Sequence, residues 1–499
     1  MAAPPATRPI VDSLTPSTAG GPRLSTPADG AGADDGAAAP AFAIASACLT
    51  LAGLTLLLLL PALFNGYPVL FADTADYLLR SRTLSPSPIR APGYAVWIRV
   101  TSAGLTLWLP VIAQSALIAA LAWRTLRAVG KPGPFTIFAA GLALATGTSV
   151  AWASSKAMPD VFIAGLILGL YLVAAHWGAM GIAARTLAVA AVIVGGTMHL
   201  TNLVVGASAL AAMILLGKSV TPQLTRASWL RAGAALVAAA GLMRAFERAP
   251  QDARPAAGSN SDVFVLSHLV ETGLAQRLLQ DRCGMESFAL CPVRDTLTRQ
   301  VELFVWRPEQ SPRYLVLGDD PALIRRETRH ILRGVVTHYP FALGASIVRY
   351  TGEQFLSFRV NDDIWRHERR THVQRAIIAV FPGDLPAQEA ARQQANTLRL
   401  PWTTAVHLVV FLAAAAFSLI VLLRAASARE LALDRAAGLH VVVWVTLIVN
   451  AAVCANAASV FARYQSRVSW LLPFAVIATL VEQGMLRWPV RAAPALANG

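Results

Sequence analysis

Two carboxylates, Asp73 and Asp76, follow the first long apolar run of the sequence at a spacing of three residues. Residues three apart on a helix lie on the same face, so both carboxylates face one site if this segment is helical. Such a pair suits a general base, or groups that orient a metal ion and a phosphate. The alternative is a capped, solvated loop helix in which neither carboxylate has a chemical role.

Arg90 lies further along the same segment, between Pro88 and Pro92. A residue near a following proline is biased toward extended backbone, and proline is favoured at a helix start, so Arg90 is expected between an extended stretch and a new helix. An arginine fixed in this way suits binding a phosphate. The alternative is an anchor to lipid headgroups.

A second polar segment holds Lys156 and Asp160, with Pro159 between them. Proline is favoured at the first position of a helix, which puts Asp160 in the first turn, where the helix dipole favours a carboxylate. Asp160 is therefore either a second site carboxylate or a structural cap. His199 is expected at a turn level with Asp160, where it either contacts the substrate or stabilises that turn.

Arg463, Tyr464 and Arg467 lie between the last two apolar runs of the sequence. The topology derived below places them on the outer face of the membrane. Because the excess of Lys and Arg belongs to cytoplasmic loops, arginines on the outer face favour a functional role over a topological one.

The elements that hold these residues are membrane spans. Only 14% of the 499 residues are charged and 55% are apolar, whereas a soluble domain carries about 25% charged residues. The apolar runs are long enough to cross a bilayer, which excludes a water-soluble globule and predicts an all-α polytopic membrane protein. Residues 1–40 have almost no large apolar side chains and are predicted to form a disordered tail. The apolar runs are 42–64, 104–123, 134–151, 159–177, 186–217, 229–246, 402–423, 439–461 and 468–485.

The run 186–217 is long enough for two short spans or one overlong helix, and His199 with Asn202 near its middle favours a hairpin. With two spans there, short segments on the N-terminal side hold fourteen Lys and Arg against seven on the opposite side. The positive-inside rule then predicts ten spans in a bacterial-type inner (plasma) membrane, with both the N-terminal tail and a C-terminal tail (487–499) in the cytoplasm. The formal charge of +14 is then mostly topological, and no nucleic-acid partner is expected.

This topology divides the chain into three parts between its tails. An N-terminal membrane module (41–247) carries outer loops at 65–103 and 152–160, an extracytoplasmic domain covers 248–401, and C-terminal membrane helices cover 402–486.

The extracytoplasmic domain is predicted to be a mixed, mainly helical cap against the bilayer. An oxidising compartment permits a disulfide between Cys283 and Cys291, and the alternative is two reduced thiols packed as small apolar groups. An amphipathic stretch (330–358) is expected to turn one apolar face to the membrane. The residues of that face are Ile331, Leu332, Val335, Val336, Leu343, Ile347 and Val348.

This constellation resembles the glycosyltransferase C superfamily, multi-span enzymes that take sugars from polyprenyl-phosphate donors. In that superfamily an acidic residue in each of the first two outer loops flanks the reaction centre; the matches here are Asp73 or Asp76, and Asp160. The stretch Arg90-Ala91-Pro92-Gly93-Tyr94 resembles an Arg-x-Pro-x-Tyr-like element that follows the first acidic residue. The chain lacks an adjacent Asp-Glu pair in the first loop and a clear Asp-x-Asp in the second, so the choice of base and any divalent metal ion stay open. The substrate-binding residues that the resemblance and the outer-face placement imply are Arg90, Tyr94, Lys156, His199, Arg463, Tyr464 and Arg467.

The resemblance implies transfer of a sugar from a polyprenyl-phosphate-linked donor to an extracytoplasmic acceptor, in contact with membrane lipids. A transporter or lipid flippase is the alternative from another class; it would place ionisable residues near the bilayer midplane, where these spans have almost none. A non-enzymatic membrane assembly subunit is a third possibility.

Overall fold

The computed structural model describes residues 35–85, 90–216, 224–248, 261–360, 364–367, 371–427 and 435–486. The predicted tails lie outside the described residues, except that 35–40 belong to α1 (Asp35–Leu58). The described residues divide into two units between Ala47 and Cys48, and the packing described below belongs to the second.

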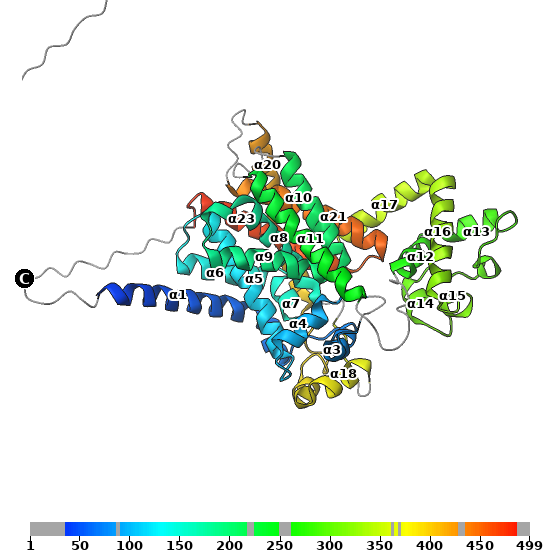
Figure 1. The fold of residues 1–499 in the computed structure, drawn as a ribbon, viewed down its shortest axis with the longest axis horizontal. Helices are drawn as coiled ribbons and strands as arrows, with labels where there is room; N and C mark the ends of the chain where they lie inside the picture. The colour runs from blue at the N-terminus through cyan, green and yellow to red at the C-terminus, as the bar shows by residue number, and fades with distance from the viewer. Residues whose placement is uncertain are drawn as a thin grey trace, which may run out of the picture. The chain divides into compact units, whose positions relative to one another are not determined.

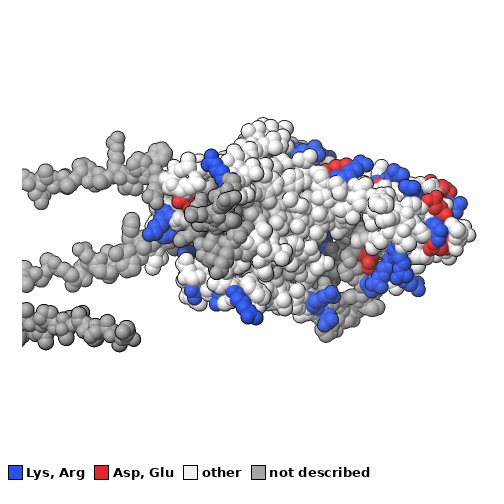
Figure 2. Space-filling model, turned by 90° about the horizontal axis from the view of Figure 1, so that it is seen from above, with Lys and Arg blue, Asp and Glu red and all other residues white. Residues whose placement is uncertain are grey.

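Four helices of the described chain are long and apolar enough to cross a membrane. They are α5 (Trp108–Val129), α11 (Arg226–Arg248), α20 (Pro401–Ser427) and α21 (Arg435–Ala457) (Figure 1). A fifth candidate is the bent pair α16 (Pro321–His338) and α17 (Pro340–Phe355). A broad part of the face in Figure 2 shows no charged side chain, as expected for a surface in contact with lipid tails. The chain is therefore a helical membrane protein.

Shorter apolar helices complete the bundle; one of them, α6, begins at Pro134 and ends at Gly147, and another, α2 (Leu60–Asn65), has Pro61 in its first turn and Gly66 as its C-cap. Proline lacks the N–H that a helix interior requires, so these residues divide the apolar runs into shorter helices. These helices are α2 (Leu60–Asn65), α6 (Pro134–Gly147), α7 (Val150–Ser155), α8 (Phe162–Ala175), α9 (Ile182–Thr197), α10 (Leu200–Leu216) and α23 (Leu471–Glu482).

The ambiguous run 186–217 forms two helices, α9 and α10, with Met198 and His199 between them. A Cβ on Gly195 of α9 would lie 2.8 Å from Leu166 Cβ of α8, and one on Gly206 of α10 would lie 2.8 Å from Leu166 Cδ2. Both helices therefore approach Leu166 of α8, as expected when the chain reverses direction between them. Each helix is about 24 Å long at 1.5 Å per residue. Taken as one helix, the run would therefore be too long for a single membrane span.

Two short helices, α3 (Thr74–Thr83) and α4 (Gly93–Thr101), follow the first apolar run, after the extended segment 67–71. Val69 forms an isolated parallel bridge with Lys156, and its N–H donates to the Ser155 carbonyl at 3.0 Å. The bridge joins the two predicted outer loops directly before Asp73 and Asp160.

A cap with its own core follows α11. It consists of α12 (Ser261–Glu271), α13 (Leu274–Arg282), α14 (Val301–Trp306), α15 (Pro312–Leu315) and α16. Ile331 and Val335 of α16 are fully buried in this core. The expectation that they face the membrane is therefore wrong, because an apolar helix face in the sequence does not say whether protein or lipid covers it.

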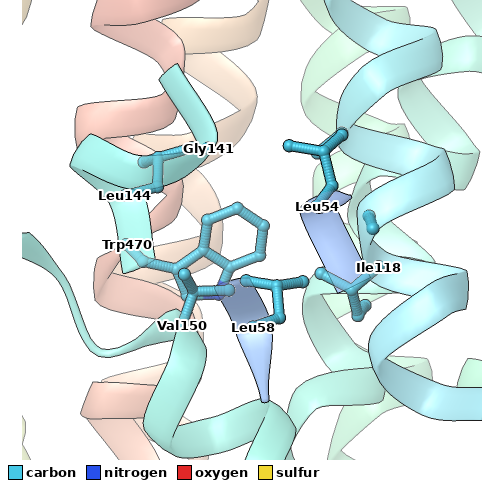
Figure 3. Close-up of a pocket in the computed structure, with 9 residues that line it drawn as sticks. Leu54, Leu58, Ile118, Gly141, Leu144, Val150 and Trp470 are labelled. Atoms are coloured by element: carbon cyan, nitrogen blue, oxygen red, sulfur yellow. The ribbon is translucent and has the colours of Figure 1, made fainter. Parts of the chain in front are cut away.

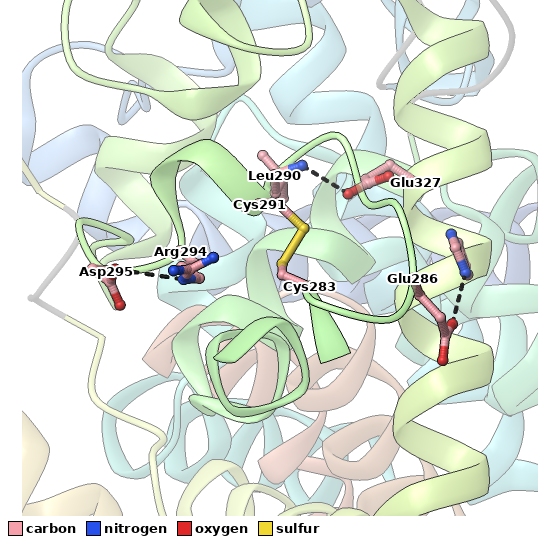
Figure 4. Close-up of a disulfide and its surroundings, with 8 residues drawn as sticks. Cys283, Glu286, Leu290, Cys291, Arg294, Asp295 and Glu327 are labelled. Carbon is pink, nitrogen blue, oxygen red and sulfur yellow. Dashed lines mark hydrogen bonds and ion pairs between the residues drawn. A yellow bond between two sulfur atoms is a disulfide. The ribbon is translucent and has the colours of Figure 1, made fainter. Parts of the chain in front are cut away.

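The predicted disulfide is present between Cys283 and Cys291 (Figure 4). The chain between them is held to α16, because the Leu290 N–H donates to the Glu327 carboxylate at 3.0 Å. The bridge thus closes a short loop over the core of the cap.

The segment from α18 (His372–Val380) through η5 (Pro382–Asp384) to α19 (Leu385–Ala390) packs on the loop that follows the first apolar run, where α18 lies against α3. The buried Asp384 carboxylate accepts hydrogen bonds from the Tyr67 hydroxyl at 2.8 Å, the Thr106 hydroxyl at 3.0 Å and the Leu107 N–H at 2.9 Å. Burial raises the pKa of the Tyr67 hydroxyl, and the adjoining Asp384 carboxylate raises it further. This contact fixes both ends of the loop that carries Asp73.

An apolar cavity lies within the bundle beside Trp470, which precedes α23 (Figure 3). Leu54, Leu58, Ile118 and Val150 are among its lining side chains. No charged or polar side chain lines it, so it is part of the core and not a centre of chemistry.

Candidate functional site

Asp73 lies at the centre of the candidate site. Its Oδ1 accepts from Arg90 Nη2 at 2.8 Å and its Oδ2 accepts from Arg463 Nη1 at 3.1 Å. Asp73 occupies the position before α3 where a cap would be, yet its side chain accepts no bond from that helix. The carboxylate is therefore committed to two arginines that lie 17 and 390 residues away in sequence.

The two arginines control the charge of this carboxylate. Burial by itself would raise the pKa of Asp73, but the charges and hydrogen bonds of Arg463 and Arg90 outweigh it, and that pKa lies below its ordinary value. Asp73 is thus an ionised acceptor in this arrangement and a weak base while both arginines hold it.

Asp76 lies one turn further along α3 and is more exposed. Its carboxylate accepts from Arg80 Nε at 2.9 Å and lies 3.4 Å from Arg90 Nε. Arg90 therefore contacts both carboxylates of the predicted pair.

Arg463, Tyr464 and Arg467 come from one short helix, α22 (Ala462–Ser469). The two arginines are four residues apart and so share a helix face. Their guanidinium carbons lie 5.0 and 5.3 Å from the centre of the Tyr464 ring, within the range of a cation–π contact. Arg463 also lies 4.3 Å from the ring centre of Phe71. The aromatic rings hold the arginines beside the first loop.

Arg467 links this helix to the second predicted carboxylate. Its Nη1 lies 3.6 Å from Asp160 Oδ1, and its Nη2 donates to Asn450 Oδ1 at 3.0 Å and to Cys454 Sγ at 3.2 Å. The side chain is 3% exposed, and its Nε has no hydrogen-bond partner among the described residues. A buried donor without an acceptor is costly and calls for an explanation.

Asp160 occupies the short turn η1 (Pro159–Val161) that precedes α8, next to Pro159 as the sequence predicts. It lies in the first turn of η1, where the helix dipole favours a carboxylate, and its Oδ1 lies 3.6 Å from Arg467 Nη1. Both predicted outer-loop acids thus face arginines of α22.

His199 and Lys156 lie at the edge of this cluster. His199 Nδ1 lies 2.8 Å from the Thr201 hydroxyl, and that hydroxyl lies 3.5 Å from Arg467 Nη2. The contact favours the turn-stabilising role of His199, while Thr201 connects it to the site. Lys156 is buried beside Val69, and its ammonium forms no ion pair with a described carboxylate.

Tyr94, predicted to bind substrate, is buried in the bundle and does not join the cluster of carboxylates and arginines. It is fully buried, and its hydroxyl donates to Gln114 Oε1 at 3.0 Å. The neighbouring Gly93 lies against Thr197, where a Cβ would be 2.5 Å from the carbonyl oxygen. The Gly93-Tyr94 part of the family-like element therefore serves packing between α4 and the bundle.

Sequence reasoning assigned no role at this site to four partners of the arginines, which are Phe71, Thr201, Asn450 and Cys454. Asn450 had a usable signal, because an amide inside an apolar run requires a partner. Phe71 and Thr201 had none, since their residue types are common in such segments.

Among the residues that the structure describes, no three or more His, Cys, Asp or Glu side chains form a group that could hold a metal ion. The three site carboxylates are engaged by arginines instead. Comparisons of the chain with models of protein families, with curated proteins and with solved structures find no match.

Proposed function

We propose that the chain is an integral membrane glycosyltransferase that moves a sugar from a polyprenyl-phosphate donor to an extracytoplasmic acceptor. The observation that carries the proposal is Asp73, paired with Arg90 and Arg463 beside the buried and incompletely satisfied Arg467. A carboxylate among arginines supplies an oxygen for the acceptor hydroxyl and positive charge for a departing phosphate.

In the proposed reaction the acceptor hydroxyl oxygen bonds to the anomeric carbon of the sugar. The bond from that carbon to the phosphate oxygen breaks, and the polyprenyl phosphate leaves with the electron pair. The hydroxyl proton passes to the Asp73 carboxylate. Arg463 and Arg467 stabilise the negative charge that grows on the phosphate, and the unsatisfied Nε of Arg467 gains its acceptor there.

The pairing implies an order of binding. While Arg90 and Arg463 both hold Asp73, its lowered pKa makes it a poor base. A donor phosphate that draws either arginine away restores the basicity of the carboxylate. The donor therefore binds before the acceptor, and initial-rate kinetics showing acceptor bound first would contradict this step.

The proposal includes the ten-span topology, with a plasma-membrane location and both termini in the cytoplasm. It is supported by the asymmetry of Lys and Arg in the short segments and by the helix pair α9 and α10 in the run that decides the count. Cysteine labelling from each side of intact cells tests it; a cap that is labelled from the cytoplasm would overturn it.

The experiment is a transfer assay with the full chain in nanodiscs and a panel of polyprenyl-phosphate sugars. We expect Asp73→Asn to lower transfer by about 10²–10⁴-fold, the usual contribution of a positioned acid or base. Asp295→Asn is the matched control, because this cap carboxylate is 70% exposed and far along the chain from the site. Unchanged transfer by Asp73→Asn would remove Asp73 from the reaction.

The same assay addresses a divalent ion. In the proposal the arginines supply the positive charge at the phosphate. Activity that is lost with a chelator and restored by Mg²⁺ would assign part of that charge to a metal ion.

A buried histidine favours a transporter as the second candidate. His440 of α21 lies 2.7 Å from Ser418 Oγ and 2.9 Å from Thr479 Oγ1, and an ionisable residue inside a span is a functional candidate. His440 lies five residues from the start of α21 at Arg435, about 8 Å along the axis, and both ring nitrogens have partners. It therefore ranks below the Asp73 centre, and movement of a lipid substrate in vesicles without covalent transfer would reverse the order.

A further inference from the structure

The elbow between α16 and α17 is an unusual feature of the cap. The two helices meet at a bend of 106° around Tyr339, and Pro340 begins the second helix. Proline cannot donate the backbone hydrogen bond that would continue α16. The bend is therefore built into the sequence, and it exposes the side chains around it.

Large apolar side chains gather at this elbow. Phe341 is 92% exposed, the highest value for a large apolar residue in the described chain, and Val336 and Val348 are 50% and 74% exposed. Elsewhere on the cap, Met285, Trp306 and Leu315 are also exposed, and scattered apolar side chains of this kind are normal for a protein surface. Three such side chains around one bend form a patch that water covers poorly.

Three exposed arginines precede this patch along one face of α16: Arg326, Arg329 and Arg333. None forms an ion pair with a described carboxylate. Glu327 does not offset them, because it is buried and bonded to the Leu290 N–H. At 1.5 Å per residue, Arg333 and Arg329 lie about 8 and 14 Å along the axis from the end of α16 at His338. The positive charge of these arginines therefore lies on α16 within about two to three helical turns of the apolar patch at the elbow.

The other end of α17 lies against a candidate span. Asn456 Nδ2 of α21 donates to Thr351 Oγ1 at 3.1 Å, and the Phe355 ring stacks on Trp444 at 6.2 Å between centroids. Figure 1 shows α17 running from α21 to the elbow. Because α21 is long and apolar enough to cross the bilayer, this contact attaches the C-terminal end of α17 to a candidate span.

We propose that the elbow docks into the membrane leaflet on the cap side and that its partner is an anionic phospholipid surface. Val336, Phe341 and Val348 enter the upper acyl region. Arg333, the nearer of the arginines to the end of α16, reaches the phosphates of the headgroup layer, and Arg329 lies one turn further from the acyl region and adds to the positive potential at this surface. The cap is then supported on lipid at one side and on α21 at the other.

The carboxylate nearest the elbow does not oppose this arrangement. Asp281 accepts a hydrogen bond from the Tyr339 hydroxyl, and the Arg277 guanidinium carbon lies 4.6 Å from the centre of the same ring. The negative charge of Asp281 is therefore accompanied by a cation, and the three arginines of α16 decide the sign of this surface.

The test uses the full chain in nanodiscs with one environment-sensitive fluorophore. Cys48 is the exposed free cysteine, Cys454 is buried and the other two are bridged, so Cys48→Ser gives a background for labelling Phe341→Cys. Leu315→Cys is the matched control, because Leu315 is an exposed leucine of the cap. We expect a blue-shifted fluorophore at 341 that doxyl-labelled lipids quench, and a water-like, unquenched one at 315.

Charge is tested separately in the Phe341→Cys background. Arg333→Gln is expected to weaken the increase in quenching that anionic lipid produces, whereas Arg307→Gln, a second exposed cap arginine, leaves it unchanged. Equal quenching at 341 and 315 would overturn the proposal. A blue shift at 341 without lipid quenching, together with a dimer by mass measurement, would assign the patch to a second copy of the chain and also overturn it.

Discussion

Replacing Asp73 by asparagine separates the structural role of the carboxylate from its proposed chemical one. The substitution keeps the shape of the side chain but leaves Arg90 and Arg463 without the charge that they both bind. Removing one partner of a fully buried ion pair costs about 3–5 kcal/mol. The three side chains are 14–16% exposed, so water screens part of this, and we expect Asp73→Asn to lower the free energy of unfolding by about 1–3 kcal/mol.

Asp76→Asn is the matched control. Asp76 is 30% exposed and its main partner is Arg80 at the i, i+4 position. Pairs of this kind contribute about 0.3–0.5 kcal/mol, so the control should destabilise the protein by less than 1 kcal/mol. Both values are measured by denaturant titration in one detergent mixture.

A double-mutant cycle with Arg463→Gln completes the experiment. Arg463→Gln leaves the carboxylate with Arg90 at 2.8 Å, so its own cost is small. In the double variant one of the two arginines that lose the Asp73 carboxylate is gone, and the loss should fall short of the sum by about 0.5–2 kcal/mol. An additive cycle, or equal losses for Asp73→Asn and Asp76→Asn, would refute the three-residue arrangement at the centre of the site.

Three further predictions concern the supports of the site. Replacing Cys283 and Cys291 by serine should lower the free energy of unfolding of the cap by about 2–3 kcal/mol, because a disulfide that closes a loop this short restricts the unfolded chain by that amount. The measurement is thermal unfolding without reducing agent, and a variant that unfolds at the same temperature as the wild type would contradict the prediction. Gly93→Ala should lower the free energy of unfolding by about 1–3 kcal/mol, because the added Cβ would meet the Thr197 carbonyl oxygen. A Cβ added at Gly133 meets no atom within 4 Å, so Gly133→Ala should leave the free energy of unfolding nearly unchanged in the same denaturant titration. Burial lowers the pKa of the His367 imidazole, so below about pH 6.5 the unfolded chain takes up a proton that the folded chain does not. The free energy of unfolding should therefore fall as the pH drops through this range. His367→Gln should flatten the dependence of the free energy of unfolding on pH, and an unchanged dependence would exclude His367 as its source.

Residues beside helix ends were the most predictable part of the site. Asp160 follows a proline at the start of an apolar run, and Arg463 with Arg467 precedes another, so sequence alone places them at the same side of the bundle once the runs are counted. The sequence does not predict which of these residues lie close together in the plane of the membrane. Nothing in the local pattern says that α22 lies beside the first loop, because that contact depends on how α21 and α23 pack.

Residues that face inward were the least predictable. Tyr94 follows Arg90 in a segment that reads as one motif, yet Arg90 contacts both acids of α3 while Tyr94 bonds to Gln114 in the core. The two side chains are four residues apart but are separated by the start of α4 at Gly93. A helix start between them turns their side chains to different surroundings, which a linear pattern does not encode.

The pairing of Asp73 argues for a function rather than for stability. A buried ion pair repays its desolvation poorly, and apolar side chains of similar size stabilise a core as well or better. This site nevertheless contains three carboxylates, Asp73, Asp76 and Asp160, against four arginines. The unsatisfied Nε of Arg467 is a cost that no described protein atom offsets. A bound anion would supply the missing acceptor, which is why the arrangement fits a site for a phosphate better than it fits a structural network.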